Sequence, residues 1–187
     1  MGRLRFDVRS LAATISAMAY DEIMRSAAAW TREFEPNNLT AAPTRHLVVL
    51  ACMDARLDLF RLLGLEVGHS HILRNAGGRA TDDAIRSIIV SSVALGTREV
   101  VVIHHTGCGL YRITNDELRH RVADASGNDP VDLEFFPFDD EGQSVLDDVA
   151  RIRACPFLPQ PMTVWGGIYD VDTGEFRVTV GPDDELS

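Results

Sequence analysis

The chain has 187 residues, 45% of them hydrophobic and 25% charged, which is typical of a globular protein and enough for one domain with a real core. Its formal net charge of −10 at pH 7 argues against binding to nucleic-acid phosphates, and no stretch approaches the roughly 18 apolar residues of a membrane-spanning helix. Three cysteines are too few for a disulfide framework, so reduced thiols and a cytoplasmic location are expected.

The N-terminal segment, residues 1–35, is predicted to form a helical arm. Apolar residues recur at roughly helical spacing over residues 11–30, which favours an amphipathic helix. Preceding arginines and the sequence Ala-Met-Ala at 17–19 resemble a signal peptide with its cleavage site. An aspartate in the basic part and hydroxyl residues in the apolar part weaken that alternative. A polar segment at 35–43 would join the arm to a second domain at 44–181.

Patterns typical of strands and helices alternate after this linker. Short apolar stretches predict strands at residues 46–52, 71–74 and 99–105. Helices are predicted between and after these strands, several with capping residues or terminal glycines, at residues 54–63, 81–95, 114–127 and 144–154. A hairpin is predicted from strands at 162–171 and 175–180, which flank an Asp-Thr-Gly turn.

The alternation of apolar strands with helical crossovers places the chain in the α/β class. Such strands argue for a parallel sheet covered by helices on both faces. In an open doubly wound sheet the first strand lies between the second and the third, which gives the order 2-1-3. The antiparallel C-terminal hairpin would extend one edge. Because the chain reverses direction between the first and third strands, ligands are expected at the carboxyl ends of those two strands.

Two chemically unusual clusters follow those same strands. Cys52 ends the first strand, and His105 and Cys108 lie at the end of the third. Two thiolates and one imidazole suit zinc, and three protein ligands leave an open fourth position, which marks a catalytic site. A single cysteine at a strand end is more often a packing residue. The joint occurrence of all three residues at the predicted crevice favours a zinc site.

Asp54 and Arg56 come directly after the first candidate ligand. A carboxylate beside zinc could itself become the fourth ligand and block the site. A bidentate contact with Arg56 would hold Asp54 away from the metal and keep it ionised. Asp54 could then accept a hydrogen bond from zinc-bound water or hydroxide. Taken alone, the pair would be an ordinary helix-terminal aspartate with a solvated arginine.

Two motifs taken together resemble the β-class carbonic anhydrases. They are Cys-x-Asp-x-Arg at residues 52–56 and His-x-x-Cys at residues 105–108. The likeness extends through residues 74–78 and 81–87 and spans roughly residues 45–180. The glutamine that plant-type members use has no counterpart just before residue 74, so the chain resembles the short bacterial branch.

The resemblance implies reversible hydration of carbon dioxide to bicarbonate and a proton by a metal-bound hydroxide. One zinc ion per chain would be held by Cys52, His105 and Cys108, with Asp54 and Arg56 as the catalytic pair. The resemblance also implies a homodimer, doubled to a tetramer in part of the family. The N-terminal arm would then embrace the partner subunit.

The sequence leaves two alternative functions open. The same branch resembles enzymes that hydrolyse carbonyl sulfide or carbon disulfide with identical metal ligands. A zinc-holding regulatory module is a further alternative, but such a module has no need of the pair Asp54 and Arg56.

Two other histidines have expected roles. His104 should point to the opposite sheet face from His105 and be structural. His120, on a predicted exposed helix, could act as a proton shuttle.

Overall fold

The structure, a computed structural model, describes residues 8–35 and 37–185. It divides into two units, one ending at Leu39 and the other beginning at Thr40. The first arginines of the signal-like stretch lie outside the described residues.

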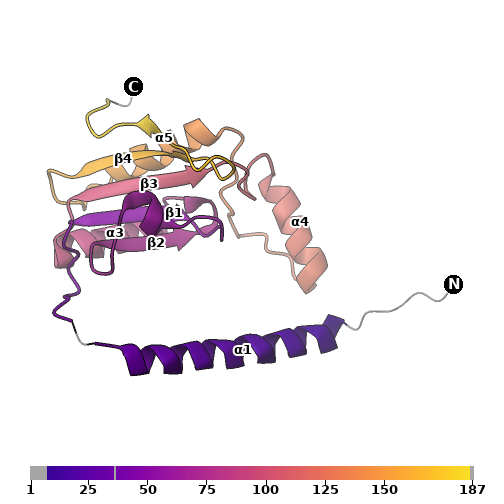
Figure 1. The fold of residues 1–187 in the computed structure, drawn as a ribbon. Coiled ribbons are helices and arrows are strands. Elements are labelled where there is room, and N and C mark those ends of the chain that lie inside the picture. Colours follow the sequence, from indigo (N-terminus) through magenta and orange to yellow (C-terminus); the bar gives the residue numbers. More distant parts are fainter. Residues whose placement is uncertain (1–7, 36, 186–187) are drawn as a thin grey trace. The chain divides into compact units, whose positions relative to one another are not determined.

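The first unit consists mainly of one long helix, α1, which spans Val8–Glu33 (Figure 1). The prediction of a helix in this segment is confirmed. The rings of Trp30 and Phe34 pack edge to face with 5.9 Å between their centroids. Among the described residues, no helix is long and apolar enough to cross a bilayer.

The second unit is built around a five-stranded sheet with the order β2-β1-β3-β4-β5. In chain order, the strands are β1 Leu47–Cys52, β2 Ser70–Asn75, β3 Glu99–His105, β4 Thr163–Tyr169 and β5 Phe176–Val180. The first four are parallel, and β5 pairs antiparallel with β4. The predicted α/β class, the order 2-1-3 and the edge extended by the C-terminal hairpin are all confirmed.

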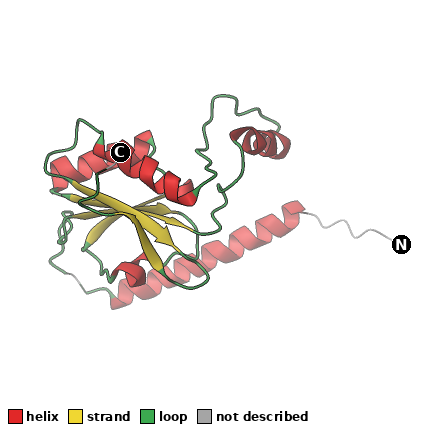
Figure 2. Cartoon of the chain, turned by 90° about the horizontal axis from the view of Figure 1, so that it is seen from above, coloured by secondary structure: helices red, strands yellow, loops and turns green. Residues whose placement is uncertain are grey.

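Helices cover both faces of this sheet, as Figure 2 shows. Helices α3 Asp82–Leu95 and α5 Glu141–Arg153 lie on one face and α2 Leu59–Leu63 lies on the other. The short 3₁₀ helix η1 Ala76–Gly78 follows β2, and α4 Asn115–Ser126 lies beyond the ends of the strands (Figure 1). Because side chains alternate along a strand, each strand feeds two separate cores. One core joins Val48 and Val100 to α3 and α5. The other joins Val49 and Val101 to α2 and Phe138.

The sequence predicted most helix boundaries through their capping residues. The Thr81 side chain accepts a hydrogen bond from the amide of Ala84 at the start of α3. Thr114 and Glu117 form the predicted capping box of α4. Helix α5 begins before the predicted residue 144, because the side chain of Asp140 caps its first turn.

The prediction of a helix over residues 54–63 is wrong in its first half, because α2 begins only at Leu59. The carboxylate of Asp54 accepts hydrogen bonds from the backbone amide and the guanidinium of Arg56, which holds this segment in a turn. Asp58 then caps the true helix by accepting from the amide of Arg61. The segment after β1 is therefore shaped around the carboxylate of Asp54.

Candidate metal centre

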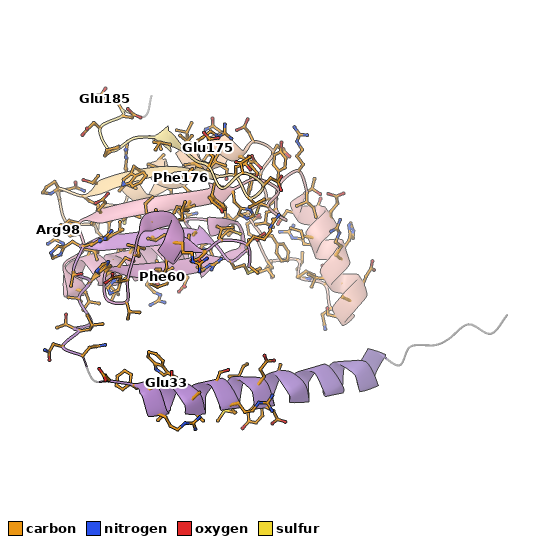
Figure 3. The ribbon with its side chains drawn as sticks, in the orientation of Figure 1. Glu33, Phe60, Arg98, Glu175, Phe176 and Glu185 are labelled. Carbon is orange, nitrogen blue, oxygen red and sulfur yellow. The ribbon has the colours of Figure 1, made fainter. Side chains whose placement is uncertain are left out.

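Three potential metal ligands meet at the carboxyl edge of the sheet. Cys52 is the last residue of β1, His105 is the last residue of β3, and Cys108 lies in the following turn. All three are buried, and their ligand atoms lie within 4.8 Å of one another. Figure 3 labels Arg98, which directly precedes β3 and so lies at the amino edge of the parallel strands. It also labels Phe176, which pairs with the last residue of β4 and so lies at the carboxyl edge. The sequence thus predicted correctly that these remote residues come together.

The imidazole of His105 is oriented for metal binding. Its Nδ1 lies 3.0 Å from the carbonyl oxygen of Thr106, so Nδ1 carries the proton and donates to that oxygen. Its Nε2 is buried and has no hydrogen-bond partner among the residues that the structure describes. A buried nitrogen lone pair beside two sulfur atoms is a donor set that suits zinc and leaves a fourth position open. The residues present therefore fit this ion.

The two thiols differ in acidity because they contact each other. A hydrogen bond from Cys108 lowers the pKa of Cys52 to about 4, and the nearby imidazole of His105 acts in the same direction. The same contact raises the pKa of Cys108 above its ordinary value, and burial adds to this effect. Burial acts to lower the pKa of His105, but the neighbouring sulfur of Cys52 and its charge outweigh burial and raise that pKa. A divalent cation would replace the shared proton and stabilise both thiolates.

Asp54 and Arg56 form the predicted bidentate pair next to this cluster. The Nε of Arg56 donates to Oδ1 of Asp54 at 2.9 Å, and Nη2 donates to Oδ2 at 2.8 Å. These hydrogen bonds hold the pKa of Asp54 well below its usual range, so the carboxylate stays ionised. Its Oδ2 lies 3.8 Å from Nε2 of His105. A fixed anionic acceptor therefore lies beside the metal-binding atoms.

Arg74 contributes to the site in a way that sequence reasoning missed. Its Nε donates to the carbonyl of Cys52 at 2.9 Å, and its Nη2 donates to the carbonyl of Asp54 at 2.6 Å. One guanidinium thus fixes the backbone of a candidate ligand and of the acidic residue. The only signal in the sequence was its position at the start of the block 74–78 that resembles the family.

The turn after β2 packs directly against the backbone of the metal site. Gly78 has a positive φ of 70°, and a Cβ at this position would lie 2.8 Å from the backbone nitrogen of Cys52. The backbone amide of Met53 donates to the carbonyl of Asn75 at 2.8 Å. Only a glycine allows this approach, which explains why the turn contains this residue.

Two further histidines can be compared with their predicted roles. His104 is 1% exposed, and its Nε2 lies 3.0 Å from Oδ2 of Asp148 on α5, which is the structural placement expected. His120 is exposed on α4 and lines a pocket with Asp116 and Arg119. Its role as a proton shuttle stays a prediction.

Comparisons with known proteins agree with this geometry. Residues 47–130 match the family model described as carbonic anhydrase. Beta-carbonic anhydrase 1 of Mycobacterium tuberculosis is 40% identical over 140 residues, covering 74% of this chain and 85% of the relative. The crystal structure of a carbonic anhydrase from Streptococcus mutans superposes with a TM-score of 0.81 at 40% identity, covering 86% of this chain and 96% of that one.

A second group of relatives has a different named activity. Carbon disulfide hydrolase of Saccharolobus solfataricus is 34% identical over 157 residues, covering 71% of this chain and 76% of the relative. This chain itself combines a mainly parallel α/β sheet with a Cys-His-Cys cluster at the carboxyl edge. The chain belongs to the β-carbonic anhydrase family. Its members are zinc lyases, and carbon dioxide hydration is the activity that the family supports.

Proposed function

We propose that this chain hydrates carbon dioxide reversibly to bicarbonate and a proton, with one zinc ion held by Cys52, His105 and Cys108. The observation that carries this proposal is the convergence of three buried donor atoms within 4.8 Å of one another. A bound zinc ion supplies activated water, because it lowers the pKa of that water toward about 7. Carbon dioxide and water together balance as bicarbonate and one proton.

Asp54 is the group that would contact the reacting water, and Arg56 holds it in place. With zinc bound, Oδ2 of Asp54 would accept a hydrogen bond from the activated water and so help to orient it for attack. Arg56 holds both carboxylate oxygens, at 2.9 and 2.8 Å, which keeps Asp54 from rotating to bind the metal. The lowered pKa of Asp54 keeps this acceptor ionised over the working range of pH.

Carbon disulfide hydrolysis is the second candidate, because a relative with that name is 34% identical over most of its length. Both reactions begin with attack of water on a linear, apolar molecule at the same centre. One zinc-loaded sample should therefore be assayed for carbon dioxide hydration by stopped flow and for sulfide release from carbon disulfide, with metal content measured alongside. Fast hydration without sulfide release supports the first proposal, and the reverse result replaces it with the second.

We further propose a homodimer in which the arm, residues 1–35, contacts the catalytic domain, residues 44–181, of a second copy. The large apolar side chains Tyr20, Ile23 and Trp30 of α1 are all more than 60% exposed, which suits burial against a partner. The molar mass in solution tests this, because one chain has a mass of 20.6 kDa. A molar mass of two chains is expected, and a mass of four chains would indicate the tetramer. A mass of one chain would contradict the proposal.

The site also favours a reducing compartment. Cys52 and Cys108 are both free thiols and must stay reduced to bind the metal. We therefore place the protein in the cytoplasm.

A further inference from the structure

A buried carboxylate contacts the chain neighbour of one candidate ligand and takes no part in the mechanism above. Asp148, on α5, is 3% exposed. Its Oδ1 accepts the backbone amide of Ala80 at 2.9 Å. Its Oδ2 lies 3.0 Å from Nε of Arg79 and 3.0 Å from Nε2 of His104. Arg79 also donates from Nη1 to Oγ of Ser144, one turn earlier on the same helix, at 2.6 Å.

This ion pair is connected to the segment that carries Cys52. The backbone of Arg79 is held on both sides by the side chain of Asn75, with Nδ2 donating to its carbonyl at 2.7 Å and Oδ1 accepting its amide at 2.8 Å. The carbonyl of Asn75 in turn accepts the amide of Met53, the residue after Cys52, at 2.8 Å. Fixing Arg79 therefore fixes the turn against which Cys52 packs.

The same ion pair reaches the segments of the other two candidate ligands. His104 is the chain neighbour of His105. The guanidinium of Arg79 lies 5.5 Å from the ring centroid of Phe138, which is also 5.7 Å from the ring of His104. The amide of Phe138 donates to the carbonyl of Leu110, two residues after Cys108, at 3.2 Å.

Stability alone gives a weak account of this arrangement. Both charged side chains are nearly buried, with 12% of Arg79 and 4% of Asp148 exposed. Removing two opposite charges from water is costly, and apolar residues of similar volume often stabilise a core equally well or better. The contacts run instead to the neighbours of all three candidate ligands.

We propose that Asp148 is a positioning residue for the metal centre, acting through Arg79 and His104 to fix the three segments that bear Cys52, His105 and Cys108. It contacts neither metal nor substrate. The inference rests on the proposed zinc site, because its role is to keep the donor atoms at the spacing that the ion needs.

Two variants and one control test this role. Asp148→Asn keeps the shape but removes the charge, and the double variant Arg79→Met with Asp148→Leu removes both charges without leaving either unpaired. The control is Arg153→Met, because Arg153 is also on α5 but donates to the carbonyls of Val164 and Gly181, at 2.5 and 2.9 Å, away from the ligand segments. The measurements are zinc affinity by chelator competition, the absorption spectrum of the cobalt form, and the melting temperature without metal.

Zinc affinity should fall about tenfold to a hundredfold in both test variants, and the cobalt bands should shift. The double variant should show this loss even where its melting temperature equals that of the unmodified protein. Arg153→Met should lower the melting temperature and leave zinc affinity unchanged. If Asp148→Asn does not fold, the zinc affinity of the double variant alone tests the inference.

The inference is overturned if the double variant binds zinc within about twofold of the unmodified protein with an unchanged cobalt spectrum, since the expected loss is at least about tenfold. A protein that binds zinc but hydrates no carbon dioxide would refute the proposed function and leave this comparison intact.

Discussion

The close approach of the turn at Gly78 to the end of β1 can be tested with a matched pair of alanine substitutions. Gly78 has a φ of 70°, and a Cβ there would lie 2.8 Å from the nitrogen of Cys52 and 3.0 Å from the carbonyl carbon of Ala51. Gly64, which ends α2, has a φ of 58°, but a Cβ there meets nothing within 4 Å. Both substitutions carry the cost of a left-handed backbone, and only Gly78→Ala adds a collision with backbone atoms.

The two costs can be separated by magnitude. A left-handed conformation costs an ordinary residue about 1–2 kcal/mol, which is the whole expected effect of Gly64→Ala. Forcing an extra methyl group into a packed region adds about 1–3 kcal/mol, so Gly78→Ala should cost about 2–5 kcal/mol. For a chain of this length each kcal/mol lowers the melting temperature by about 2–4 °C.

Differential scanning calorimetry of the metal-free proteins measures this difference, and chelator competition measures the consequence for zinc. Gly78→Ala should melt several degrees below Gly64→Ala and bind zinc more weakly, because relief of the collision must move the backbone of Cys52. Equal melting temperatures and equal zinc affinities in the two variants would refute the reasoning.

Four further outcomes are expected. Asp54→Asn should retain zinc but lose about 10²–10⁴-fold in carbon dioxide hydration, measured by stopped flow with metal analysis, and full turnover would contradict its role. Cys108→Ser should lose zinc, and a variant that keeps a full equivalent would refute the ligand assignment. Thr114→Ala should cost about 1 kcal/mol in chemical denaturation by removing the cap of α4, whereas no change would mean that the cap contributes nothing. Hydrogen bonds from the amides of Thr173 and Asp172 lower the pKa of Asp170, so it stabilises the fold above its ordinary pKa and this contribution is lost as the pH falls. Asp170→Asn should therefore lower the melting temperature at pH 7 more than at pH 2, and an equal loss at both would contradict this.

The sequence was sufficient to predict the sheet and the convergence of Cys52, His105 and Cys108. The apolar strands have no polar face, which requires helices on both sides, and chain direction then brings the ends of the first and third strands together. These inferences depend on local patterns and on general rules of chain connection. The boundaries of α3 and α4 were predictable for the same reason, since their caps lie within a few residues of the helix start.

The parts that the sequence did not reveal depend on contacts between distant residues. Asp148 follows another aspartate on a helix with several charges, so it reads as solvated, yet it is buried against Arg79. In the sequence, Arg74 is indistinguishable from any charged residue near a strand end. Its role depends on its hydrogen bonds to the carbonyl groups of Cys52 and Asp54, which only the structure shows. The late start of α2 arises because the carboxylate of Asp54 binds Arg56, and helix propensity does not include that competition.

The guanidinium of Arg56 also reaches a second loop, because its Nη2 donates to the carbonyl of Gly107 at 3.2 Å. One side chain thus braces the chain after β1 and the residue just before Cys108. A substitution of Arg56 would therefore change the rate of catalysis in two ways at once. It would release the carboxylate of Asp54, and it would remove a hydrogen bond from the loop that carries Cys108. The roles of Asp54 and Arg56 are better separated by replacing Asp54 with asparagine, because this change retains the side chain that donates to Gly107.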